Sequence, residues 1–176
     1  MNGACPEIQT DLSVYEASLI LEPYYEAVLE EFVTAGLVRC QSTEFVVAPW
    51  VHDAPRHFGA CRDDGTEIIV APELAEQDER IVLAILSHEL GHATDALYPG
   101  EFALGRDRTA IRRRREDFNP DQWARWMRSW EDRDSDPVEF IADAIAEEVM
   151  QVKIGYTGPC KLQCFNVGRR RPRGLR

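Results

Sequence analysis

His88, Glu89 and His92 form a His-Glu-x-x-His pattern within residues 87–95, SHELGHATD. On a helix, residues four apart lie on one face, so both imidazoles can reach the same metal ion. Glu89 lies beside them, where it can act as general base toward an attacking water. Two of the chain's four histidines fall in this pattern. The alternative is an amphipathic helix whose two histidines are solvated or satisfied by neighbours.

A catalytic zinc site usually takes three protein ligands and one water, so a third ligand must come from elsewhere. Glu139, in the stretch 136–149, DPVEFIADAIAEEV, is the best candidate. Asp136 followed by Pro137 is a typical helix start. Asp143, one turn after Glu139, would accept a hydrogen bond from a zinc-binding histidine and fix its ring. The alternative role for Glu139 is the glutamate of a capping box that begins at Asp136.

Three other residues compete for the third position. Asp95 lies three residues after His92 on the same helical face. Its spacing suits a hydrogen bond to a metal ligand better than direct coordination, so we expect it to support a ligand and not to bind the metal itself. Cys40 and Cys61 are further candidates, because zinc also accepts thiolate.

The elements around the motif are predicted as a strand, a short connection and a buried helix. Residues 66–71, TEIIVA, read as a strand closed by Pro72. Asp78 is a suitable N-cap for a helix over residues 79–97. The first half of that helix, residues 81–86, is apolar on every side and should pass through the core. A rigid, anchored helix is what a metal site needs.

The remaining chain supplies a long helix and a second strand. Residues 13–35 predict a helix that contains Pro23 and ends at Gly36, and residues 44–48 predict a strand. Residues 51–64 are expected to be irregular, up to a turn at Asp64-Gly65. Residues 101–133 hold four consecutive arginines and three tryptophans at helical spacing, which we interpret as a packed stripe or, alternatively, an aromatic wall for substrate.

Length and composition favour one globular domain. The chain has 176 residues, of which 44% are hydrophobic, and a net charge of −11. This charge disfavours nucleic-acid binding by the fold as a whole, although two runs of basic residues could contact anionic partners. We expect a domain over residues 1–160 and a basic, flexible tail over residues 161–176. No signal peptide or membrane span is evident, so we expect a cytoplasmic protein with reduced cysteines and no membrane partner.

HELGHATD followed by EFIAD resembles the gluzincin metallopeptidases, in particular the anthrax lethal factor catalytic domain and the Pro-Pro endopeptidases. Short cytoplasmic peptidases that cleave phage-type repressors carry a similar HELGH motif. The likeness covers about residues 66–97 and 137–149. It implies Zn²⁺ bound by His88, His92 and Glu139, with Glu89 as general base and a protein or peptide as substrate. It also implies an edge strand along which the substrate lies; the residues assigned to that strand are Ile68, Ile69, Val70 and Ala71.

The chain departs from the lethal-factor group at one position. That group has a tyrosine shortly before the ligand glutamate, thought to steady the oxyanion, and residues 126–138 contain none. The sequence does not choose among four substitutes, namely Tyr98, Tyr156, His52 and His57.

These observations predict an α+β, zincin-like single domain, with a small mixed sheet packed on an active-site helix and a second ligand-bearing helix. The predicted function is zinc-dependent endopeptidase activity through a metal-activated water. One alternative is a catalytically inactive, zinc-stabilised binding protein. Another is a zinc hydrolase of a different amide, such as a deformylase, which pairs the motif with an upstream cysteine; here that residue would be Cys61.

Overall fold

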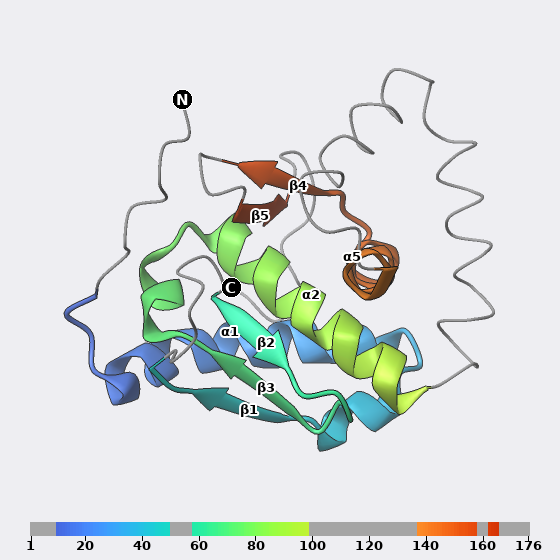
Figure 1. Cartoon of the computed structure of the whole chain (residues 1–176), viewed down its shortest axis with the longest axis horizontal. Coiled ribbons are helices and arrows are strands. Elements are labelled where there is room, and N and C mark those ends of the chain that lie inside the picture. The colour runs from blue at the N-terminus through green and yellow to red at the C-terminus, as the bar shows by residue number, and fades with distance from the viewer. Residues whose placement is uncertain (1–9, 50–57, 99–136, 158–161, 166–176) are drawn as a thin grey trace.

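The computed structural model describes residues 10–49, 58–98, 137–157 and 162–165. The described chain is a small α+β assembly in which α2 runs between a three-stranded sheet and α5 (Figure 1). The predicted arginine run and tryptophan stripe lie outside the described residues. None of the described helices is both long and apolar enough to cross a membrane.

Helix α1 (Val14–Thr34) confirms the first predicted helix. Its start is fixed by a capping box, because the Ser13 side chain accepts from the Glu16 amide while the Glu16 carboxylate accepts from the Ser13 amide. Pro23 lies within the helix without ending it. Gly36, at φ +94°, adopts the left-handed conformation with which helices commonly end.

The main sheet contains β1 (Glu44–Val47), β2 (Gly59–Cys61) and β3 (Glu67–Val70), in the order β1-β3-β2. β1 pairs parallel to β3, and β2 pairs antiparallel to β3. β1 and β3 confirm the two predicted strands. β2 corrects the expectation that residues 51–64 are irregular throughout. Residues 59–61 pair with β3, and the tight turn at Gly65 connects the two strands.

Helices α1 and α2 pack on the same face of this sheet. Phe45 of β1 stacks on Tyr25 of α1, with ring centroids 4.5 Å apart. Paired residues in a sheet point to one face, so Phe45 shares a face with its partner Ile68, which is fully buried. Gly59, two residues from Cys61 and paired with Val70, lies on this face against α2.

Helix α2 (Glu79–Leu97) has the predicted boundaries. Asp78 caps it by accepting a hydrogen bond from the Arg80 amide at 2.9 Å. Residues 81–91 are buried without interruption, as the apolar first half of the helix requires. Two short 3-10 helices, η1 (Val38–Ser42) and η2 (Pro72–Glu76), connect the strands to the longer helices.

Helix α5 (Pro137–Met150) packs along α2 and is followed by a hairpin of β4 (Ile154–Thr157) and β5 (Leu162–Phe165). The buried Glu147 carboxylate accepts from the Ile154 amide at 3.0 Å, which joins the end of α5 to the hairpin. Residues 162–165 of the predicted tail thus form a strand of the described fold, and Phe165 belongs to the core. Residues 166–176 lie outside the described residues.

Candidate metal centre

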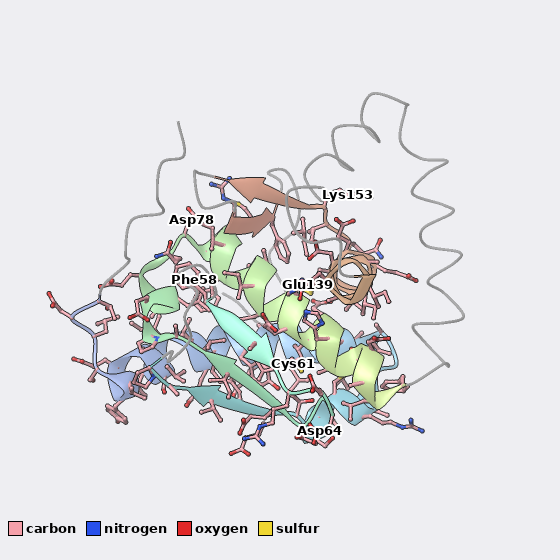
Figure 2. The ribbon with its side chains drawn as sticks, in the orientation of Figure 1. Phe58, Cys61, Asp64, Asp78, Glu139 and Lys153 are labelled. Atoms are coloured by element: carbon pink, nitrogen blue, oxygen red, sulfur yellow. The ribbon has the colours of Figure 1, made fainter. Side chains whose placement is uncertain are left out.

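The side chains of His88, His92 and Glu139 converge between α2 and α5. The two Nε2 atoms lie 3.0 Å apart. The Glu139 carboxylate lies 3.0 Å from His88 Nε2 through Oε2 and 3.4 Å from His92 Nε2 through Oε1. All three ligand atoms lie within 4.8 Å of one another, and Figure 2 shows Glu139 between the two helices. The structure thus brings together the three predicted ligands.

These separations fit a tetrahedral ion. Zinc bonds to nitrogen and carboxylate oxygen are about 2.0–2.2 Å long, so two ligand atoms on a tetrahedral ion lie about 3.3–3.6 Å apart. The three distances in the cluster, 3.0, 3.0 and 3.4 Å, require only a small expansion. The donor set of two imidazoles and one carboxylate is one that zinc uses in hydrolases.

His88 is held by a carboxylate on each nitrogen. Its Nδ1 lies 2.7 Å from Asp143 Oδ1, and both side chains are buried. A proton on Nδ1 would be donated to Asp143 and leave the Nε2 lone pair for a metal. The predicted hydrogen bond between Asp143 and a histidine of the pattern is therefore present. Among the described residues, Asp95 makes no such hydrogen bond to either histidine.

The competing ligands do not join the cluster. Asp95, Cys40 and Cys61 are absent from the group of converging ligand atoms that the described residues form. The thiol of Cys40 is buried 3.3 Å from Thr94 Oγ1. The thiol of Cys61 donates to the carbonyl of Arg62 at 3.3 Å. The described residues thus favour Glu139 over a thiolate as the third ligand.

Glu89 is a buried carboxylate beside the cluster, with 6% of its surface exposed. Within the part of the chain that the structure describes, no hydrogen bond reaches its carboxylate. Burial raises the pKa of Glu89, and the nearby His88 and His92 offset part of this effect.

The cluster shifts the pKa of its own members. Burial lowers the pKa of His88, but the carboxylates of Asp143 and Glu139 outweigh burial and raise it to about 10. Burial raises the pKa of Glu139, but hydrogen bonds to His88 and His92 outweigh it and hold this pKa well below its usual range. Without a metal, a protonated His88 therefore balances the neighbouring carboxylates.

Gly91 permits the close approach of α2 and α5. A Cβ atom at this position would lie 2.3 Å from the carbonyl oxygen of Ala142. Gly91 lies between the two histidines in the sequence, and Ala142 lies between Glu139 and Asp143. The two backbones therefore meet within the same helical turns that carry the cluster and Asp143.

The strand to which substrate binding is assigned is central in the sheet, not at its edge. β3, which contains Ile68, Ile69 and Val70, is the central strand, so its main-chain groups are taken on both sides. Ala71 follows β3, and its amide donates to the carbonyl of Phe58. No extended peptide can therefore add to this strand.

β2 lies at the edge of the described sheet and next to α2. The Phe58 carbonyl and the Arg62 amide both bond toward β3. Hydrogen-bonding direction alternates along an antiparallel strand, so the main-chain groups of Gly59 and Cys61 point away from β3, where no described strand pairs with them. Sequence reasoning missed this strand, although the apolar run 58–61 before an Asp-Gly turn is a hairpin signal.

Of the four proposed substitutes for the missing tyrosine, Tyr98 is engaged elsewhere. Its hydroxyl accepts from the Arg39 amide at 2.9 Å, and the Arg39 guanidinium lies 4.8 Å from the ring centroid. His52, His57 and the side chain of Tyr156 lie outside the described residues. Tyr98 thus stabilises the end of α2, and no oxyanion partner is identified among the described side chains.

Comparison with protein-family models, with curated proteins and with solved structures gave no match.

Proposed function

We propose that this chain is a zinc-dependent endopeptidase of the gluzincin type, with a zincin-like arrangement of sheet and helices. The observation that carries the proposal is the convergence of His88, His92 and Glu139 beside Glu89, a buried carboxylate with no hydrogen-bond partner among the described residues. A metal alone would need the three ligands. The additional buried carboxylate is what hydrolysis requires.

Each residue has a distinct role in the proposed reaction. When bound, zinc would polarise the scissile carbonyl and lower the pKa of water toward about 7. Glu89 accepts the proton of the attacking water and passes it to the leaving amine. Asp143 holds His88 in the orientation in which Nε2 faces the cluster. Burial around Glu89 excludes bulk water, which strengthens these electrostatic interactions.

The proposed substrate is an extended segment of protein or peptide. The outward amides and carbonyls of Gly59 and Cys61 offer main-chain hydrogen bonds beside Glu89. A peptide that adds to β2 as a further strand would satisfy them and pass along α2. This geometry supports a polypeptide over a small amide, because a small amide would leave the strand edge unused.

The test combines zinc content with hydrolysis of an unbiased peptide library. Glu89→Gln should keep zinc and lose hydrolysis, whereas Glu139→Ala should lose most of the zinc. Cys61→Ala should keep both, because the thiol is not part of the cluster. Hydrolysis that survives Glu89→Gln would contradict the role of Glu89 as base, and full zinc loading of Glu139→Ala would contradict the ligand assignment.

Two outcomes would redirect the proposal. Zinc-loaded wild type that cleaves no peptide in the library would support a zinc-stabilised binding protein instead. Release of formyl or other small acyl groups, without cleavage of internal peptide bonds, would support a hydrolase of another amide.

A further inference from the structure

Gly59 is the residue of β2 that lies against Glu89. A Cβ atom at this position would lie 3.0 Å from Cγ, 3.1 Å from Oε1 and 3.3 Å from Cδ of Glu89. Non-bonded carbon atoms prefer separations of about 3.5–4.0 Å. Any side chain larger than hydrogen at position 59 would therefore press directly on the Glu89 carboxylate.

The backbone conformation of Gly59 does not call for glycine. Among the described glycines, Gly36 and Gly65 have the positive φ that other residues avoid, and Gly59 does not. Glycine within a strand weakens it, because there is no side chain to pack. The contact with Glu89 is the feature of the described structure that accounts for glycine at position 59.

The Glu89 carboxylate depends on packing for its position. It is buried, and no described residue holds it through a hydrogen bond. A shift of a few tenths of an ångström would therefore be opposed by the buried neighbours of Glu89 and not by a hydrogen bond from a described residue. Small displacements matter for a general base, since proton transfer requires hydrogen-bond distance to the reacting water.

We propose that Gly59 is a positioning residue for Glu89. Its missing side chain leaves the carboxylate room to stay beside the His88–His92–Glu139 cluster, in reach of an attacking water. The catalytic consequence rests on the proposed function. The steric contact between the two residues does not, so it can be tested separately.

The catalytic test compares Gly59→Ala with Ala60→Ser. Each change adds one heavy atom to β2, but Ala60 faces the opposite side of the sheet. With zinc bound, Gly59→Ala should lower kcat about tenfold while KM and zinc content stay within about twofold. Ala60→Ser should leave all three near wild type. Loss of zinc from Gly59→Ala would overturn the proposal, because the residue would then act on the ligands.

A conservative variant of the neighbour provides a rescue. Glu89→Asp shortens the side chain by one methylene and withdraws it from position 59. In that background, Gly59→Ala should change kcat by less than about twofold, because contacting residues are non-additive. The same tenfold loss in both backgrounds would contradict an effect exerted through Glu89.

Unfolding of the metal-free protein gives a readout that needs no activity. In the protein that keeps Glu89, Gly59→Ala should raise the unfolding equilibrium constant about tenfold. In the Glu89→Ala variant, which lacks the contacted atoms, the same change should raise it less than about twofold. Equal effects in both backgrounds would overturn the proposal. If Gly59→Ala alone fails to fold, the double variant with Glu89→Ala should fold. If the wild type hydrolyses no peptide, the proposed function is rejected. The unfolding comparison of the wild type, the two single variants and the double variant would still decide whether Gly59 acts on Glu89.

Discussion

The imidazole of His88 is fixed from both sides, by Asp143 at Nδ1 and by Glu139 at Nε2. His92 has no corresponding carboxylate partner at its outer nitrogen among the described residues. The described residues thus orient His88 through two carboxylates and His92 through Glu139 alone. This difference follows from the spacing on α5, where Glu139 and Asp143 are one turn apart and both face α2.

Asp143→Asn should lower zinc affinity by about 10–100-fold, because loss of the carboxylate weakens both the orientation and the basicity of His88. Asp95→Asn is the matched comparison, since Asp95 interacts electrostatically with His92 but makes no hydrogen bond to either histidine in the described structure. It should change affinity by less than about threefold. Competition with a chromophoric chelator measures both. Equal losses of zinc affinity in the two variants would show that Asp95 supports the metal ligands as much as Asp143 does.

The pKa shifts of the cluster predict how the stability of the metal-free protein varies with pH. The pKa of His88 is raised from 6.5 to about 10, so its contribution is complete below pH 6.5 and is lost as pH rises toward 10. The pKa of Glu139 is lowered from 4.5, so its contribution is present above pH 4.5 and is lost as pH falls further.

The cluster should therefore stabilise the metal-free protein most between pH 4.5 and 6.5. Urea unfolding with a chelator present, at pH values across both flanks, measures this profile. His88→Gln should flatten the alkaline flank, because the group that titrates is removed. A free energy of unfolding that increases from pH 6.5 to 9 in the wild type would contradict the assignment.

At the scale of elements, the site depends on how closely α2 approaches α5. Gly91→Ala would place a methyl group against the Ala142 carbonyl, where only 2.3 Å is available. The helices must then separate, which should cost about 1–3 kcal/mol or more in stability and weaken zinc binding as Glu139 is withdrawn. Chemical unfolding and zinc titration measure the two effects.

Because Gly91 faces the backbone of Ala142, a second change to Ala142→Gly should not rescue Gly91→Ala. Recovery of stability in that double variant would show that the Ala142 methyl group, and not its carbonyl, sets the separation. Recovery of zinc binding without recovery of stability would show that the three ligands can bind zinc when α2 and α5 are further apart.

At the scale of the whole molecule, the proposed ion would join parts of the chain that are far apart in sequence. Its ligands come from α2 and α5, and the described hairpin β4–β5 is tied to α5 through Glu147. Zinc at about 1,000 times its dissociation constant would add about 4 kcal/mol to folding stability. Removal by a chelator should lower Tm by roughly 8–16 °C for a chain of this size. In Glu139→Ala, the chelator should have little further effect.

Local patterns in the sequence determined the elements that carry the site. A spacing of four residues, about one helical turn, places His88 and His92 on one face, and the same spacing places Glu139 and Asp143 on one face of α5. Asp78, Gly36 and the Asp64–Gly65 turn marked boundaries, because capping and turn formation involve neighbours in the chain. These predictions concern interactions within a few residues, which sequence alone specifies.

Only the tertiary structure decided which elements meet. Asp95, Cys61 and Glu139 all suited zinc by type, and the approach of α5 to α2 at Gly91 brought Glu139 to the two histidines. The strand 67–70 was compatible with an edge position as well as a central one, because the pattern of side chains does not reveal how many neighbouring strands there are. β2 is three residues long, too short for a period to appear, and its place beside Glu89 depends on contacts between distant parts of the chain.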